Sequence, residues 1–290
     1  MDTYKLKPKS TKINKISKEN FEKDTGKLKP NYQEGKDSQY AVCPVCDNPI
    51  SIIGLYNPKT QTKPYGKHYP GNIENLAVYD KYKYETCPYA SRIWEDKTKK
   101  VKSNIDGTAK DIIKFMQENF DSVIRLLRQI TGIVFNDKMI EKMIQHFLSA
   151  KGYAYYNAYV MNSAWIFGYM QVRVGFYGMV IDNSHPIYNA LINHPCVKIE
   201  NGRIVANNGY IKPEFYFMLH RTKQKDNIKS EYINYYIDIN EENIFKQEIK
   251  IDLPLFSKIL NRKTEKTAND IRYIEMFQNA CKNIVYYINL

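Results

Sequence analysis

Three cysteines and one histidine between Ala41 and Trp94 constrain the fold of this chain more than any other feature of its sequence. Cys43 and Cys46 form a C-x-x-C pair, His68 follows after 21 intervening residues, and Cys87 follows after a further 18. Three thiolates and one imidazole make a complete tetrahedral ligand set for Zn²⁺, of the closed kind used by structural sites. The sequence therefore predicts a zinc-binding module over residues 41–94 with these four side chains as ligands.

The spacing of the four residues has a physical reason. A C-x-x-C turn lets two sulfurs reach one ion from a tight bend, which Pro44 stiffens by fixing its own φ. The other ligands can be distant because the ion itself closes the loop. The module resembles small zinc-knuckle or zinc-ribbon elements, which implies a structural ion, and it does not fit a C2H2 finger. A redox pair and a chance pattern stay open as alternatives, as does a site of three cysteines without His68.

Catalytic zinc is not favoured by the residues around these ligands. A nucleobase deaminase needs an H-x-E motif upstream of its cysteine pair, and a zinc peptidase needs H-E-x-x-H. Neither motif occurs in the chain. Four protein ligands also leave no position for a reacting water, so we expect Zn²⁺ to stabilise the fold.

The composition indicates the class of partner. The net charge is +12, and the chain holds 25 tyrosines and 12 phenylalanines. Lysine neutralises phosphate and aromatic faces stack on bases, so both features favour nucleic-acid binding. A general compositional bias toward Lys, Asn, Ile and Tyr gives the same counts and stays open as an alternative.

The compartment predicted from the sequence is the cytoplasm. Five cysteines in 290 residues are too few for a secreted disulfide scaffold. The N-terminus lacks the apolar region of a signal peptide. The most apolar stretch, residues 152–174, contains asparagine, glutamine and arginine, so we interpret it as buried protein and expect no membrane span.

Residues 1–40 read as a basic flexible arm. They hold ten lysines with few apolar residues between them. Such a segment is not expected to bury enough surface to offset the entropy of ordering it. The arm can lie along a phosphate backbone, or it can be a solubilising tail.

Residues 103–290 read as an α+β domain. Helical periodicity covers 106–170, with helices at 106–131, 137–150 and 153–169. Residues 172–251 are β-rich, with an Asn201-Gly202 hairpin turn and strands at 214–221, 231–240 and 244–251. Helices fill 252–288. The predicted fold class is α+β, with an N-terminal zinc module, a helical middle and a C-terminal antiparallel sheet flanked by helices.

Basic residues in predicted linkers and loops are the candidates for contact with nucleic acid. They lie in the charged linker after the zinc module, in and beside the loop expected at 222–227, and in the loop at 261–266. The candidates are Lys97, Lys99, Lys100, Arg221, Lys223, Lys225, Lys229, Arg262 and Lys263.

Two weaker constellations stay open. Asp238, Glu248 and Lys250 on neighbouring predicted strands resemble the core of PD-(D/E)-x-K nucleases, which implies carboxylates that hold a divalent ion. The resemblance covers three residues, and Ile237 stands where that motif has proline. A second metal site from three of the other histidines (His185, His194, His220) and Cys196 also stays open, although its spacing fits no known ligand pattern.

These observations predict a partner class and no reaction. We expect a basic zinc-containing protein that binds nucleic acid or a nucleoprotein without catalysis. The alternatives are an inhibitor or accessory factor that binds an acidic or nucleic-acid-processing protein, and a metal-dependent nuclease.

Overall fold

The computed structural model describes residues 1–36, 39–56, 63–85, 87–90, 101–102 and 105–282. The chain divides into two compact units. Unit 1 comprises Met1–Trp94, Arg221–Glu231 and Ile251–Lys263, and unit 2 comprises Glu95–His220, Tyr232–Lys250 and Thr264–Leu290. The chain is an α+β protein with antiparallel sheets, as predicted. Within the described ranges, no helix combines the length and apolar character that crossing a bilayer requires.

Unit 1 is built around a three-stranded antiparallel sheet. Its strands are β3 (Gln39–Val42), β4 (Pro49–Ile53) and β5 (Tyr65–His68), in that order. The unit also contains β1 (Thr3–Tyr4), β2 (Asn14–Lys15), α1 (Lys18–Thr25), α2 (Lys81–Glu85) and α7 (Leu253–Leu260).

One face of this sheet is buried under the N-terminal segment. Ala41 and Ile50 lie opposite each other in the register and are fully buried. Gly66 on β5 lies so close to its neighbours that an added Cβ would sit 2.9 Å from Ile50 Cδ1 and 3.0 Å from Met1 Cγ. The N-terminal ammonium donates a hydrogen bond to the Gly66 carbonyl at 3.0 Å. The first residue of the chain therefore belongs to the core of unit 1.

The prediction of a flexible arm is wrong for residues 1–36, which fold as part of unit 1. Tyr4 and Phe21 are fully buried against each other, with ring centroids 5.7 Å apart. Ile13 is buried, and its backbone N–H donates to Ser257 Oγ at 2.9 Å, far along the sequence. Apart from the exposed Leu28, the few apolar side chains of the segment are buried or partly buried, and most of its lysines are exposed. A prediction from average composition therefore missed the packing of this segment.

The described helices of unit 2 largely follow the predicted periodicity. They are α3 (Gly107–Thr131), α4 (Asp137–Ser149), α5 (Ser163–Tyr169), α6 (Ile187–Ile192) and α8 (Ala268–Lys282), with short 3₁₀ turns η1 (Gly152–Ala154) and η2 (Val160–Asn162). The Asp106 side chain caps α3 by accepting from Ala109 N, and Gly132 ends it in the left-handed conformation.

The helix predicted over 153–169 is present only in its second half, as α5. Asn162 explains the difference. Its Oδ1 accepts from Tyr159 N at 2.9 Å and its Nδ2 donates to Asn157 O at 2.9 Å. Such side-chain-to-backbone bonds compete with helical ones. The segment before α5 therefore folds as separate turns.

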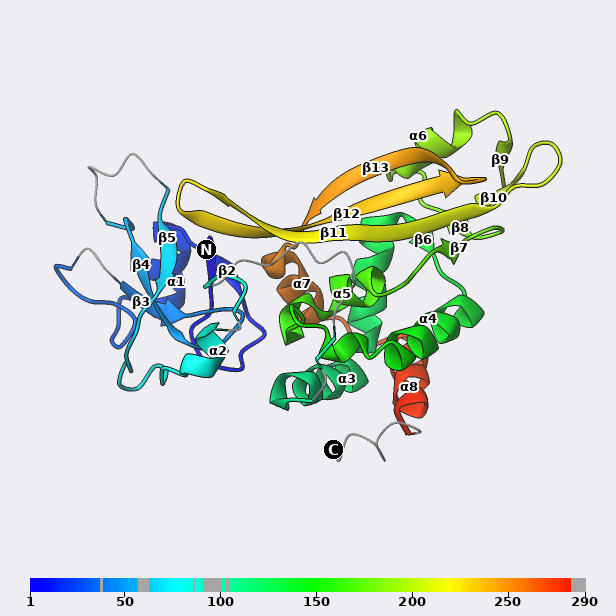
Figure 1. Ribbon diagram of the computed structural model, residues 1–290. Helices are drawn as coiled ribbons and strands as arrows, with labels where there is room; N and C mark the ends of the chain where they lie inside the picture. Colours follow the sequence, from blue (N-terminus) through cyan, green and yellow to red (C-terminus); the bar gives the residue numbers. More distant parts are fainter. Residues whose placement is uncertain (37–38, 57–62, 86, 91–100, 103–104, 283–290) are drawn as a thin grey trace. The chain divides into compact units, whose positions relative to one another are not determined.

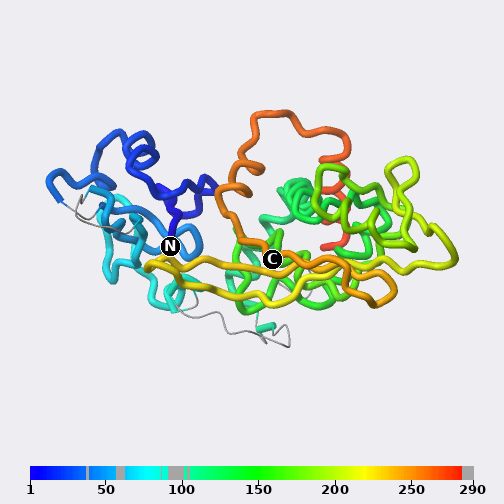
Figure 2. The backbone as a smooth tube through the Cα atoms, turned by 90° about the horizontal axis from the view of Figure 1, so that it is seen from above, coloured from blue at the N-terminus to red at the C-terminus, as the bar shows by residue number. Residues whose placement is uncertain are grey.

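Two four-stranded antiparallel sheets complete the fold. The first has the order β13 (Glu242–Lys250), β12 (Ile228–Ile239), β11 (Pro213–Lys225), β7 (Val174–Gly175), and the second β6 (Ile133–Val134), β8 (Val180–Ile181), β10 (Arg203–Ala206), β9 (Val197–Glu200). β11 and β12 are longer than predicted and run side by side to a turn at Asp226 and Asn227 (Figure 1, Figure 2). Both turn residues have positive φ, which the tight turns of hairpins favour. The loop expected at 222–227 is therefore mostly strand.

The core of unit 2 lies between the sheet that contains β11–β13 and the helices of the unit. Helices α3, α4, α5 and α8 lie on one side of β11–β13 (Figure 1). Phe215, Phe217 and Tyr235 are buried on that side of the sheet. On the helices, Phe120 stacks on Phe277 with centroids 4.7 Å apart. This stacking packs α3 against α8, and α3 carries the apolar face that the periodicity predicted.

Candidate metal centre

The structure brings together the four side chains predicted as metal ligands. Cys43 directly follows β3, and Cys46 lies in the turn that leads to β4. His68 is the last residue of β5, and Cys87 follows α2. Their ligand atoms all lie within 4.8 Å of one another, and the three cysteines are buried. No other group of three or more such side chains clusters in the part of the chain that the structure describes, so a second site at His185, His194, Cys196 and His220 gains no support.

The spacing of the ligand atoms fits a tetrahedral ion. With bonds of about 2.3 Å to sulfur and about 2.05 Å to nitrogen, tetrahedral angles place two sulfurs about 3.8 Å apart and a sulfur and a nitrogen about 3.6 Å apart. Cys43 Sγ and Cys87 Sγ are 3.9 Å apart, and Cys46 Sγ and His68 Nε2 are 3.3 Å apart. A disulfide needs about 2.05 Å, and all three cysteines are free thiols. The four residues can therefore hold one metal ion.

The turn that carries the cysteine pair is a tight knuckle between β3 and β4. Val42 and Pro49 pair across the strands, and Cys43 N donates to Asn48 O at 2.8 Å. Asp47 adopts a φ of 62°, a conformation that aspartate tolerates better than most residues. The redox alternative required a helix after the second cysteine, and strand β4 follows instead.

Asn48 joins the knuckle to the segment before α2. It is fully buried, and its Nδ2 donates to Cys46 Sγ at 3.3 Å and to Asp80 O at 3.1 Å. Its Oδ1 accepts from Asp80 N at 2.6 Å. Groups that bond to metal ligands set the ligands' orientation and charge. Asn48 therefore both orients one sulfur and fixes the start of the helix that precedes Cys87.

Lys5 is a second supporting residue, and sequence reasoning assigned it to the flexible arm. Its backbone pairs with Val42 in both directions, with N···O distances of 3.0 and 2.9 Å. Its side chain is buried, forms an ion pair with Asp47 and donates to Pro44 O at 3.5 Å. An ammonium group at the knuckle offsets part of the negative charge of three thiolates. In the sequence, the only indication of this role was that Lys5 follows a residue with high strand propensity, Tyr4.

The electrostatics of the three sulfurs favour a bound cation. Burial raises the pKa of the Cys43 and Cys87 thiols well above its ordinary value. Hydrogen bonds from these thiols lower the pKa of Cys46, and His68 adds to this effect. Burial therefore opposes the simultaneous ionisation of the three thiols. Three thiolates together require a positive ion among them.

The residues predicted to contact nucleic acid fall largely in the same unit as the metal centre. Lys97, Lys99 and Lys100 lie outside the described residues. The end of the β11–β12 hairpin that belongs to unit 1 carries Arg221, Lys223, Lys225 and Lys229. Two further candidates in unit 1, Arg262 and Lys263, follow α7. Lys223, Lys225 and Lys263 are exposed. Lys229 Nζ donates to Ala90 O at 3.0 Å, and Arg262 Nη1 donates to Ile259 O at 3.3 Å, so these two also serve the fold.

The register of β12 and β13 does not support a nuclease site. Glu248 pairs with Asn234, four residues from Asp238 on β12. This separation is roughly 14 Å along the strand, too far for one ion to bind both carboxylates. Asp238 is also buried and bonded to Arg173, to Tyr216 Oη at 3.2 Å and to Asn243 Nδ2 at 2.9 Å. Its contacts are those of a structural residue.

In comparisons with known proteins, no family model, curated protein or solved structure matched this chain.

Proposed function

We propose that the metal centre binds Zn²⁺ as a structural ion and that unit 1 binds nucleic acid. The donor set supports zinc, because three thiolates and one imidazole favour Zn²⁺ over harder ions such as Mg²⁺. Four protein ligands and burial leave no open coordination position, so the ion's role is to join β3, β4, β5 and the segment after α2.

The distribution of charge carries the nucleic-acid proposal. Unit 1 holds 23 of the 43 lysines and arginines but only 13 of the 31 aspartates and glutamates, a surplus of ten. Unit 2 holds 20 and 18. Nearly all of the net charge of +12 thus belongs to the unit with the metal centre. A uniform compositional bias would give both units a similar surplus, so this asymmetry favours a polyanionic partner for unit 1.

The solvent-facing side of the small sheet offers aromatic contacts beside this charge. Tyr40, Ser51 and Lys67 form one row across β3, β4 and β5, opposite to the buried face. Tyr69 packs edge-on against Tyr40, with ring centroids 5.4 Å apart. Lys67 is exposed and the two tyrosines are partly exposed. Aromatic side chains next to cations favour strands with unstacked bases over duplexes.

The test is direct titration of the zinc-loaded protein with a labelled single strand and with the duplex of the same sequence. We expect binding that weakens steeply with salt, tighter binding to the single strand, and a weaker complex for Lys67→Ala. Lys198→Ala in unit 2, which removes the same charge from an exposed strand, is the matched control.

Other results would favour the alternatives. Failure to bind either nucleic acid at low salt, together with a co-purifying acidic protein, favours an inhibitor or accessory factor. Magnesium-dependent cleavage of the probe that Glu248→Ala abolishes would favour a nuclease. Metal analysis of the same preparation should give one zinc per chain, and content below a tenth of that value after reconstitution would contradict the zinc proposal.

A further inference from the structure

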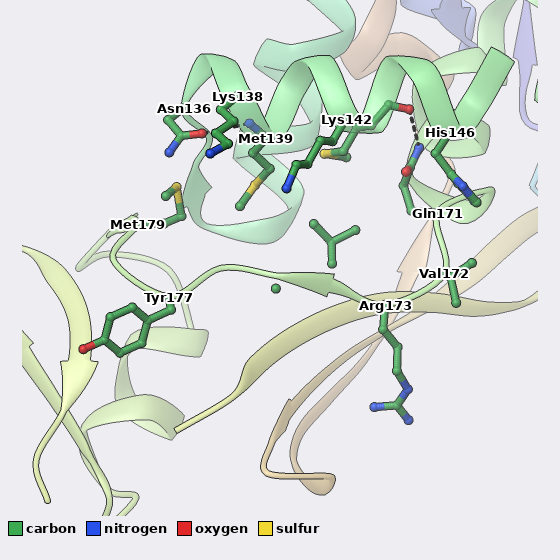
Figure 3. Close-up of a pocket in the computed structure, with 13 residues that line it drawn as sticks. Asn136, Lys138, Met139, Lys142, His146, Gln171, Val172, Arg173, Tyr177 and Met179 are labelled. Carbon is green, nitrogen blue, oxygen red and sulfur yellow. Dashed lines mark hydrogen bonds between the residues drawn. The ribbon is translucent and has the colours of Figure 1, made fainter. Parts of the chain in front are cut away.

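A cavity of about 460 Å³ lies in unit 2 between helix α4 and the segment that contains β7. One wall is the face of α4 that carries Lys138, Lys142 and His146, and the other is the chain from Gln171 to Met179 (Figure 3). The Gln171 side chain ties the walls together by donating to Met143 O at 3.2 Å. A volume of this size is typical of small-molecule sites.

The charge of the lining is one-sided. Among its described residues are Lys138, Lys142, His146 and Arg173, and none is Asp or Glu. Unit 2 as a whole has nearly equal numbers of basic and acidic residues, so the cations are concentrated here. Arg173 is committed to Asp238, and its side chain points away from the cavity in Figure 3. His146 Nε2 lies 3.1 Å from Met170 O, so the two lysines are the cations available to a ligand.

Lys138 and Lys142 are well placed to bind one anion. They are one helical turn apart, which puts their Cβ atoms about 6 Å from each other on the same face of α4. Both are exposed, and within the described part of the chain neither ammonium group has an ion-pair or hydrogen-bond partner. Two unpaired ammonium groups at this spacing suit the oxygens of a phosphate.

The remaining lining is apolar and adaptable. Met139, Met143 and Met179 are buried and contribute thioether groups to the walls. Tyr177 stands at the rim with 53% of its surface exposed. Methionine sulfur and a tyrosine ring make favourable contacts with a flat aromatic group. The lining therefore combines an anion-binding edge with surfaces for an aromatic body.

We propose that this cavity binds a nucleoside phosphate, with the phosphate on Lys138 and Lys142 and the base against the methionines and Tyr177. The inference does not depend on nucleic-acid binding by unit 1. Two sources share this chemistry, a free nucleotide and the 5′-phosphorylated end of a strand.

The experiment is a calorimetric titration of the full chain with AMP, adenosine and inorganic phosphate. We expect AMP to bind, and adenosine and phosphate each to bind at least tenfold more weakly, because each lacks one half of the recognised structure. Lys142→Ala should weaken AMP binding roughly tenfold, and Tyr177→Ala should weaken it several-fold. Both residues are exposed, so folding is preserved. Lys114→Ala on α3 is the matched control and should bind as the wild type does.

Equal AMP affinity in wild type and Lys142→Ala, or no AMP binding at millimolar concentration, would overturn the proposal. Equal affinity for AMP and phosphate would refute the role of the apolar wall. Competition against AMP with a 5′-phosphorylated tetranucleotide, compared with its unphosphorylated form, distinguishes the two sources. If only the 5′-phosphorylated tetranucleotide competes, the natural ligand is a strand end. If neither tetranucleotide competes, the ligand is a free nucleotide.

Discussion

Replacing Asn48 with alanine tests whether the centre depends on support from outside its four ligands. The substitution removes the contact to Cys46 Sγ and both hydrogen bonds to Asp80. Each backbone bond contributes about 1 kcal/mol, so the free energy of unfolding should fall by about 2 kcal/mol. Asp80 is exposed, and water can replace part of the loss. Loss of a group that orients a metal ligand lowers metal affinity by roughly 10- to 100-fold, or about 1.4–2.7 kcal/mol.

The assay is competition for Zn²⁺ between the reduced protein and a chromophoric chelator, with Co²⁺ absorption as a report on coordination. Asn72→Ala is the matched control, because Asn72 Oδ1 accepts from Tyr79 N at 2.8 Å in the same region without contacting a sulfur. We expect tetrahedral Co²⁺ spectra from all three proteins and weaker binding only for Asn48→Ala. An affinity within twofold of wild type would refute the reasoning.

Three further outcomes are expected. Phe21→Ala should lower the free energy of unfolding by about 3–5 kcal/mol in denaturant titrations, because Phe21 is fully buried. An unchanged denaturation midpoint would instead support the original prediction of a flexible N-terminal arm. Metal affinity should rise about 100-fold per pH unit near neutral pH, because burial raises the pKa of two thiols, Cys43 and Cys87, whose protons the ion must displace; pH-independent competition would contradict this. Lys223→Ala with Lys225→Ala should reduce the salt slope of single-strand binding by about 1.4, and an unchanged slope would place the contact elsewhere.

The features that sequence predicted well are those set by local chemistry. The ligand set followed from residue type alone, since few combinations other than a metal site explain three cysteines and a histidine in one segment. The ends of α3 followed from Asp106 as a cap and Gly132 in the left-handed conformation. The hairpin between β9 and β10 followed from Asn201 and Gly202, both at positive φ.

The features that sequence missed depend on distant partners. Tyr4 and Phe21 are isolated apolar residues among lysines, and nothing near them indicates the sheet that covers them. The bond from Ile13 to Ser257 joins residues 244 positions apart, so no local pattern contains it. The support of the metal knuckle by Lys5 has the same origin, because its partner Asp47 lies far along the sequence in the turn between β3 and β4.

The metal centre and the charge of unit 1 have opposite effects on its stability. A surplus of ten positive charges on a unit whose main strands have four or five residues each favours unfolding through self-repulsion. A tetrahedral ion opposes this by linking the β3–β4 knuckle to β5 and to the segment after α2, because binding to the folded site contributes directly to folding. A bound polyanion would lower the same repulsion. On the proposed function, zinc and nucleic acid therefore stabilise the same state of unit 1, and each should strengthen the binding of the other although they occupy different sites.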